Sequence, residues 1–204
     1  DRVVTQSAFF QDSVHLNEQW IFVAGARYQL YDQMSGRGRP FSKNTDIDGQ
    51  VWVPRVGLVY KLNDELSLYG GYTESFKPNS TIAPLTNGAS INGVQPEEGK
   101  SWEIGAKLDR PGRITGTLAL FDIVKENVLV TQTDNATGLT LATGAGEVRS
   151  RGVELDVTGQ LTDDLSLIGT YAFTDAEVTK DPELKGNGLQ NVARHTASLY
   201  GVYD

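Results

Sequence analysis

Residues 147–176, EVRSRGVELDVTGQLTDDLSLIGTYAFTDA, alternate between apolar and polar side chains on both sides of a short polar turn. The residues that share the apolar side are Val153, Leu155, Val157, Leu161, Leu165, Leu167, Tyr171 and Phe173. A repeat of two residues is typical of β-strands, because successive side chains point to opposite faces. The stretch therefore predicts a β-hairpin with one apolar and one polar face. A soluble β-sandwich and the wall of a membrane barrel both satisfy this pattern.

The composition narrows the class of protein. The chain has 204 residues, 39% of them hydrophobic, a formal net charge of −8 and no cysteine. The longest apolar run, WIFVAGA at 20–26, is far shorter than the roughly 18 residues of a membrane helix. This excludes an α-helical membrane protein but leaves a β-barrel open, because barrel strands alternate and look polar on average. The negative charge argues against nucleic acid as a partner.

The same period-two pattern recurs along the chain. It predicts strands at 4–15, 19–33, 50–62, 65–76, 99–109, 113–124, 147–161, 165–176 and 195–204. The short connections between them are 16–18, 63–64, 110–112 and 162–164, and the long ones are 34–49, 77–98, 125–146 and 177–194. Short and long connections alternate, which in an antiparallel β-meander places all tight turns at one end of the sheet. Outer-membrane barrels have this asymmetry, so an all-β transmembrane barrel wall is expected.

The strand faces agree with a membrane barrel. Residues predicted to share the lipid-facing side are Trp102, Ile104, Leu155, Val157, Leu167 and Tyr171. Charged side chains are nearly absent from the centre of that face, and Tyr and Trp recur near strand ends, where membrane barrels carry aromatic girdles. The core of a soluble sandwich could also explain this face. The loop alternation is what favours the membrane.

No catalytic or metal-binding motif is present. The segment NTDIDG at 44–49 imitates half of a calcium loop, but the twelfth position is Arg55 where a bidentate Glu is required. It is interpreted as a polar loop. The glycines of GAGEVRSRG lead into a strand, so they cannot form a phosphate cradle at a helix N-terminus. With only His15 and His195 and no nucleophile elbow, we expect neither an enzyme nor a protein metal site.

Several longer segments carry a family resemblance. They are PRVGLVYKLNDELSLYGGYTESFKPN (54–79), VQPEEGKSWEIGAKLD (94–109), GEVRSRGVELDVTGQLTDDLSLIGTYAFTDAEV (146–178), NVARHTASLYGVYD (191–204) and the opening hairpin that ends in G-x-R-Y. In this order they resemble the barrel of TonB-dependent ferric-siderophore receptors, in the ferrichrome- and pyoverdine-receptor branch. One departure is Ala193, where the family usually has Pro; it affects a loop end.

The resemblance implies a barrel of about 22 antiparallel strands with a plugged lumen. This chain offers about nine of them, so 1–204 is expected to be a partial barrel domain, with the N-terminal plug and the TonB box outside it. The implied function is an outer-membrane receptor that binds a ferric siderophore at its extracellular mouth and is energised through TonB. Its expected partners are the ferric siderophore, the TonB complex (through the missing N-terminal part) and the lipid bilayer. Iron would arrive chelated, so no cofactor is expected.

Tyr31 and Phe41 are the candidate ligand-binding residues, because both lie near or in the first long connection. Packing in a girdle or loop is the alternative role for each. Two alternatives for the whole protein also stay open: a porin-like barrel without a plug, and a soluble carbohydrate-binding β-sandwich.

Overall fold

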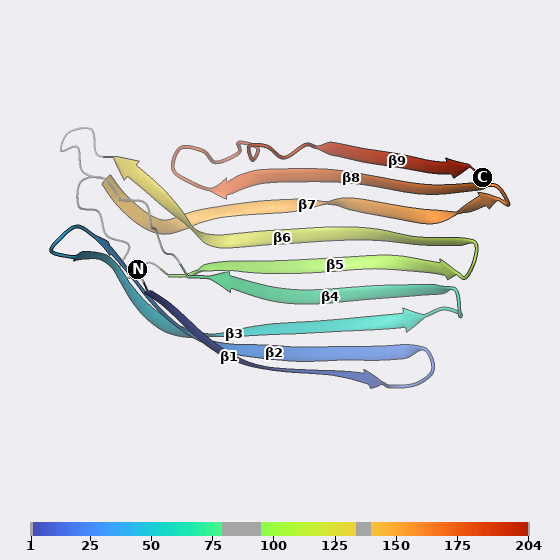
Figure 1. The fold of residues 1–204 in the computed structure, drawn as a ribbon, viewed down its shortest axis with the longest axis horizontal. Helices are drawn as coiled ribbons and strands as arrows, with labels where there is room; N and C mark the ends of the chain where they lie inside the picture. Colours follow the sequence, from blue (N-terminus) through green and yellow to red (C-terminus); the bar gives the residue numbers. More distant parts are fainter. Residues whose placement is uncertain (1, 79–94, 134–139, 204) are drawn as a thin grey trace.

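The computed structural model describes residues 2–78, 95–133 and 140–203, which form one open antiparallel sheet (Figure 1). Its nine strands lie in chain order, each hydrogen-bonded to the next. The strands are β1 (Arg2–His15), β2 (Trp20–Arg37), β3 (Ser42–Lys61), β4 (Leu66–Lys77), β5 (Glu97–Arg110), β6 (Ile114–Thr133), β7 (Thr140–Thr162), β8 (Leu165–Lys180) and β9 (His195–Tyr203). The predicted β-meander is confirmed.

The β1–β2, β3–β4, β5–β6 and β7–β8 turns lie at one end of the sheet, on the right in Figure 1, whereas the four-residue β2–β3 turn and the remaining connections start from the other end. Two of these turns share a Leu-Asn sequence. The side-chain Oδ1 of Asn17 accepts hydrogen bonds from the backbone N–H groups of Gln19 and Trp20, both at 2.8 Å. Asn63 binds Glu65 and Leu66 in the same way, at 2.9 and 2.8 Å. An Asn side chain that caps its own turn fixes the strand register.

The prediction of long loops at 34–49 and 125–146 is wrong. The segment 34–49 is strand except for the four residues between β2 and β3, and the ends of 125–146 continue β6 and β7 as strand. Most of the predicted loop at 77–98 lies outside the described residues. Beyond the bilayer both faces of a two-stranded ribbon meet water, so the alternation of apolar and polar residues that marks a strand disappears there. Only 177–194 behaves as predicted, since β8 ends at Lys180 and turns follow.

One face of the sheet is apolar, and no other part of the described chain covers it. Cross-strand register places Leu118, Leu155 and Tyr171 side by side, and Ile104 opposite Leu120. Trp102 and Ile104 are 61% and 59% exposed, and Ala119 is the one buried apolar residue among the described residues. In the described part of the chain no second layer packs on the sheet. A soluble sandwich needs two packed sheets around a core, so that alternative is wrong.

Aromatic side chains border this apolar face at both ends. Trp20 and Tyr60 stack near the tight turns with ring centroids 4.5 Å apart. Tyr28 and Trp52, at 4.9 Å, stack at the other end. Trp20 and Tyr28 lie eight residues apart on β2, about 26 Å along a strand, a length comparable to the apolar band of about 25 Å on an outer-membrane barrel. We define the membrane-spanning segments of β2 and β3 by these borders, as Trp20–Tyr28 and Trp52–Tyr60.

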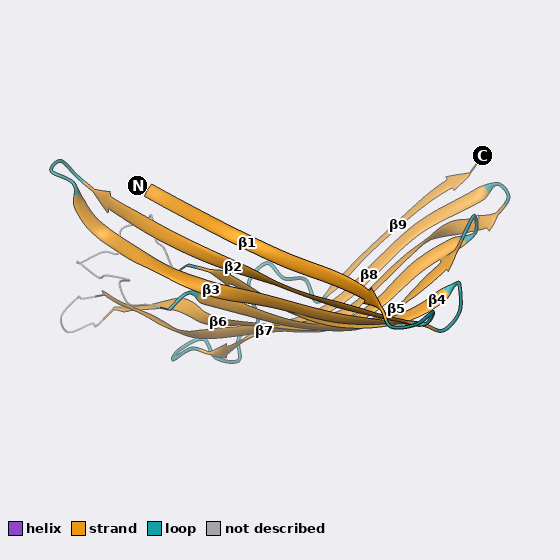
Figure 2. Cartoon of the chain, turned by 90° about the horizontal axis from the view of Figure 1, so that it is seen from below, coloured by secondary structure: helices purple, strands orange, loops and turns teal. Residues whose placement is uncertain are grey.

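Tyr72 and Trp102 form another aromatic pair, with ring centroids 4.6 Å apart. This pair is displaced along the strands relative to Tyr28 and Trp52. Tyr72 pairs with Val56, four residues from Trp52 on β3. Such a step between neighbouring strands is the stagger that tilted barrel strands require. Figure 2 shows the resulting curvature: the sheet bends into an open trough whose edge strands, β1 and β9, do not meet. The opposite face carries the polar residues Ser101, Glu103, Glu154 and Thr158 and corresponds to the barrel lumen. No helix in the described residues could cross a membrane.

Candidate ligand-binding mouth

A cleft opens where β3 separates from β4. β3 pairs with β2 from Tyr60 as far as Ser42, but it pairs with β4 only from Arg55 to Lys61. The free length of β3 and the end of β4 therefore form two walls, and the start of β5 closes the third side. The cleft has a volume of about 440 Å³. It lies at the end of the sheet opposite the β1–β2, β3–β4, β5–β6 and β7–β8 turns.

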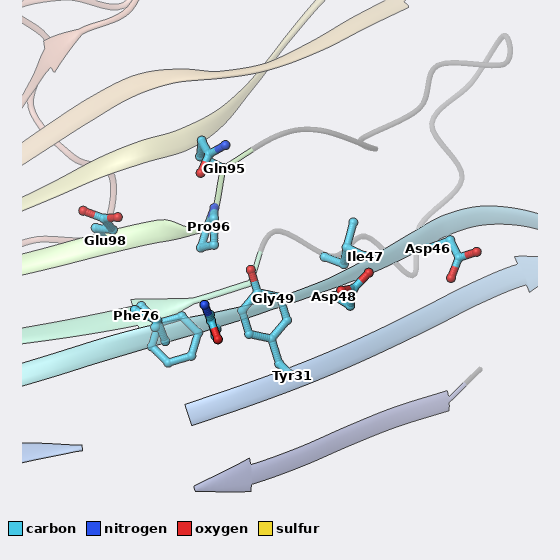
Figure 3. A pocket seen from close by; sticks show the side chains of 11 residues that line it. Tyr31, Asp46, Ile47, Asp48, Gly49, Phe76, Gln95, Pro96 and Glu98 are labelled. Atoms are coloured by element: carbon cyan, nitrogen blue, oxygen red, sulfur yellow. The ribbon is translucent and has the colours of Figure 1, made fainter. Parts of the chain in front are cut away.

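Tyr31 of β2 reaches into this cleft across β3 (Figure 3). Its cross-strand partner is Gly49, and a Cβ at Gly49 would lie 2.5 Å from the Tyr31 hydroxyl oxygen. Glycine is thus required for the phenol ring to lie flat over the strand. On the other wall, the ring of Phe76 lies 5.8 Å from that of Tyr31, centroid to centroid. The two rings form an aromatic surface of the kind that binds flat, amphipathic ligand groups.

The polar groups of the cleft are carboxylates, amides and the Tyr31 phenol. Asp48, Gln50 and Glu98 line it beside the two rings. Tyr31 lies three residues beyond the membrane-spanning segment of β2. Burial, and then the nearby Asp48 carboxylate, raises the pKa of its phenol above the usual value. Tyr31 therefore stays protonated at neutral pH and can donate a hydrogen bond to a ligand oxygen.

Contacts behind the cleft hold its β5 wall. The Asn127 side-chain amide donates to the carbonyl of Pro96 at 3.1 Å. Glu97, whose side chain is 9% exposed, forms ion pairs with Lys125 at 2.6 Å and Lys77 at 3.8 Å. A nearly buried carboxylate between two cations ties β4, β5 and β6 together. Pro96 and Glu98 are thereby held in place on either side of Glu97.

Of the two candidate ligand-binding residues, only Tyr31 lies in the cleft. Tyr31 lines the cleft, whereas Phe41 lies in the β2–β3 turn, 50% exposed, with its ring against Gly36. Phe41 is not among the residues that line this cleft. Ligand binding by either residue stays a prediction.

Sequence reasoning missed Asp48, Phe76 and Glu98. The signal for Asp48 and Gly49 lay in NTDIDG, which was interpreted as a polar loop and is part of strand β3. Phe76 and Glu98 come from strands that meet the cleft only because β3 separates from β4. In the described residues no group of three or more Asp, Glu or His side chains is placed to hold a metal ion.

Another hollow, of about 480 Å³, lies on the apolar face between Trp20, Tyr60 and Trp102, over Gly70. Its volume is similar, but its walls are almost entirely apolar side chains of the face that carries the aromatic borders. In a membrane, lipid acyl chains cover that face. The cleft at the mouth, with its mixed polar and aromatic walls, is therefore the better ligand site.

Comparisons with known proteins agree with this architecture. The sequence model of the family described as "TonB dependent receptor-like, beta-barrel" matches residues 1–204. The chain is 38% identical to the metal-pseudopaline receptor CntO of Pseudomonas aeruginosa over 203 residues, covering 95% of the chain and 27% of that protein. It is 32% identical over 201 residues to the ferrichrome outer membrane transporter/phage receptor of Escherichia coli, covering 95% of the chain and 25% of that protein. The chain thus spans about a quarter of the length of these relatives.

Solved structures show the same fold. The ferripyoverdine receptor of the outer membrane of Pseudomonas aeruginosa, bound to ferripyoverdine, superimposes with a TM-score of 0.78 at 22% identity, covering 98% of the chain and 26% of that structure. The alcaligin outer-membrane receptor FauA of Bordetella pertussis gives a TM-score of 0.76 at 22% identity, covering 98% of the chain and 34% of that structure. In both, the sheet described here corresponds to part of a larger barrel.

Proposed function

Because the chain belongs to the TonB-dependent receptor-like β-barrel family, we propose that it forms part of the wall and mouth of a receptor that imports a ferric siderophore through the bacterial outer membrane. The family consists of receptors and transporters. The relatives named above include receptors for metal-pseudopaline and ferrichrome. A porin-like barrel without a ligand site is the weaker alternative, since the matched family is one of receptors.

The observation that carries the proposal is the position of Tyr31. Its ring lies over Gly49 at the mouth end of the sheet and, with Phe76, lines a cleft of about 440 Å³. That volume lies within the range of small-molecule sites, about 300–1,000 Å³. The protonated phenol can donate to an oxygen of the chelating ligand, while the rings cover its apolar parts. Iron enters as part of the chelate, so the protein needs no metal ligands of its own.

Transport needs a step that the wall alone cannot supply. We propose that the full-length protein carries a plug in its lumen, and that TonB, driven by the proton-motive force, displaces the plug after the siderophore binds. The wall contributes the mouth site and a polar lumen. No bond in the ligand is made or broken, so binding and gated passage are the whole mechanism.

The test is ligand binding by the full-length receptor in detergent. Ferrichrome, ferripyoverdine and metal-pseudopaline complexes would be titrated against the receptor, with tryptophan fluorescence as the readout. We expect one of these chelates to bind, and Tyr31→Ala to weaken its affinity about tenfold, the effect of losing a hydrogen bond and a ring contact.

Phe41→Ala is the matched control, since it removes an exposed ring at the same end of the sheet but outside the cleft. It should leave the affinity within about twofold of the original. Equal losses for Tyr31→Ala and Phe41→Ala would show that the cleft is not the site. Failure of all ferric chelates to bind or to support iron-limited growth would reject the receptor function itself.

A further inference from the structure

One backbone edge of β3 faces the mouth cleft without a neighbouring strand. The odd-numbered residues of this strand direct their N–H and C=O groups to β2, as the hydrogen bond from the Lys61 N–H to the carbonyl of Gln19 shows. The even-numbered residues direct theirs to β4, as the bond from the Leu62 N–H to the carbonyl of Leu66 shows. The β3–β4 ladder ends at Arg55. Beyond it, the even-numbered residues therefore direct their backbone groups into the gap between the two strands.

The position of Pro54 agrees with this alternation. Pro54 is the first even-numbered residue beyond the end of the β3–β4 ladder, and it pairs with Ala26 of β2. Proline has no N–H group, so it fits inside a strand only where that group would have no partner strand. Because its nitrogen faces the gap, Pro54 leaves the ladder between β2 and β3 intact.

Asp48 and Gln50, two of these even-numbered residues, line the cleft. Alternate residues of a strand lie about 6.8 Å apart. In the part of the chain that the structure describes, nothing forms a hydrogen bond with their backbone groups on this side. The opposite wall is similar, since β4 pairs with β3 only as far as Thr73 and Phe76 lies beyond it. The cleft thus offers regularly spaced backbone donors and acceptors beside its two aromatic rings.

The charge of the cleft is negative. The carboxylates of Asp46, Asp48 and Glu98 line it, and the described residues of its walls include no lysine or arginine. Lys43 forms an ion pair with Asp46 at 2.7 Å. Among the described residues, neither Asp48 nor Glu98 has an ion-pair partner. Two carboxylates without cations beside a free strand edge attract a cationic ligand and repel an anionic one.

An extended peptide matches both the backbone edge and the charge. Its N–H and C=O groups repeat every second residue, at the same spacing of about 6.8 Å that β3 presents. Addition of a strand to a free sheet edge is one of the common ways in which proteins bind peptides. A cationic side chain on such a peptide would be attracted to Asp48 and Glu98. Chelates made only of catechol or citrate groups have no comparable run of amides.

We infer that the mouth cleft takes a ferric chelate built on a short, positively charged peptide, and that this peptide pairs with the free edge of β3 as an added strand. The inference rests on the proposed function, because it names the ligand class of that same site. The backbone groups of Asp48 and Gln50 select a peptide, and the carboxylates of Asp48 and Glu98 select its charge.

Binding of matched synthetic chelates to the full-length receptor in detergent tests the ligand class. The probe is the ferric complex of a linear peptide with three N-hydroxyornithine hydroxamates and the extension Ala-Lys-Ala. One derivative has the amides of the extension N-methylated, and another has glutamate in place of lysine. We expect the probe to bind, and either change to weaken its affinity about tenfold or more, through lost backbone hydrogen bonds or reversed charge.

Gln50→Pro removes the backbone donor on the receptor side. Gln50→Ala is the matched control, because both variants lose the same side chain, including its hydrogen bond from Tyr28. The Gln50 N–H takes no part in the β2 ladder, so β3 should accept a proline there as it does at Pro54. Gln50→Pro should bind the probe about tenfold less tightly than Gln50→Ala. The two variants should bind the N-methylated derivative equally.

The double variant Asp48→Asn/Glu98→Gln tests the charge. It should reduce the preference for the lysine probe over the glutamate derivative to about twofold, since the cleft then lacks both carboxylates. Circular dichroism would show that each receptor variant is folded. If Gln50→Pro does not fold, the N-methylated derivative tests the same hydrogen bonds on the unmodified receptor.

Equal affinity for the probe and its N-methylated derivative would overturn the inference. So would equal affinity of folded Gln50→Pro and Gln50→Ala for the probe. Binding of ferric citrate by a receptor that does not bind the probe would also overturn it, and the receptor function would then stand with another ligand class. Failure of the proposed function looks different, because in that case no ferric chelate of any class binds.

Discussion

Gly105 shows at the scale of one residue how the lumen face is built. Its cross-strand partner is Tyr69, whose ring lies over the glycine, with its hydroxyl 2.6 Å from a Glu103 carboxylate oxygen. A Cβ at Gly105 would lie 2.6 Å from both that ring and the carbonyl oxygen of Leu118. Phe121 over Gly152 and Tyr31 over Gly49 repeat the arrangement on the same face. Aromatic rings therefore cover glycines across strands on the lumen side.

Gly105→Ala should destabilise the barrel by about 1–3 kcal/mol, because the methyl group meets backbone that cannot move aside. Gly70→Ala is the matched control on the adjacent strand. A Cβ there would meet no atom closer than 3.5 Å, so a change near zero or a small gain is expected. Urea unfolding of the full-length receptor in lipid measures both. A loss of the same size in the two variants would contradict the covered-glycine account.

Val157→Arg should impair assembly by about 2–4 kcal/mol, the cost of a cation at the bilayer midplane. Val157 pairs with Gly116 and Gly169 near the middle of the apolar face. Thr158→Arg places the same side chain one residue away on the lumen face and should be tolerated. Outer-membrane assembly, measured by the yield of folded receptor, separates the two. Equal yields would reject the assigned orientation of the faces.

At the scale of the elements, the stability of a hairpin such as β3–β4 depends on its turn. Asn63→Ala should cost about 1 kcal/mol, because the N–H groups of Glu65 and Leu66 lose their acceptor at the β3–β4 turn. Asn63→Asp keeps the acceptor and should be nearly neutral. Unfolding rates of the full-length receptor in urea would show the difference. If the Asp variant is destabilised as much as the Ala variant, the side-chain cap does not hold the turn.

All nine strands could be predicted from the sequence wherever one face meets lipid, because Trp102, Ile104 and Leu155 then alternate with polar residues. The same criterion failed at 34–49 and 125–146. There β2, β3, β6 and β7 continue as strand into water on both sides, and residues such as Asp46 and Asp48 leave no apolar face to recognise. Backbone hydrogen bonds between partner strands, which no local pattern reveals, maintain those ribbons.

For a related reason, only part of the candidate site could be predicted from the sequence. Tyr31 could be named from its place beside the first long connection. Its neighbours Phe76 and Glu98 are distant in sequence and reach the cleft because β3 and β4 separate after Arg55. Such a separation follows from the twist of paired strands and not from residue types. Phe41, named on the same reasoning as Tyr31, lies at the ribbon tip instead.

At the scale of the whole molecule, the sheet has two open edges and an apolar face without cover. Exposing apolar surface to water costs a free energy of about 25 cal/mol per Å². Unpaired strand edges bind other chains. Residues 1–204 produced alone should therefore self-associate, by edge pairing or by packing of the apolar faces, unless detergent covers them. Light scattering with and without detergent measures this. A compact, detergent-free monomer would contradict the lipid-facing assignment.

The central claim is that the face with Ile104, Leu155 and Val157 meets lipid and the alternate face meets the lumen. The most direct measurement is the accessibility of single spin labels to oxygen and to a water-soluble nickel complex, with the full-length receptor in lipid bilayers. Residues 1–204 contain no cysteine, so, with any cysteine in the rest of the receptor replaced, labels can be placed one by one along β7 from Val153 to Leu161. Labels at Val153, Leu155 and Val157 should be accessible to oxygen, and those at Glu154, Asp156 and Thr158 shielded from it, in strict alternation. A profile without that period of two, or with the two sets exchanged, would contradict the account.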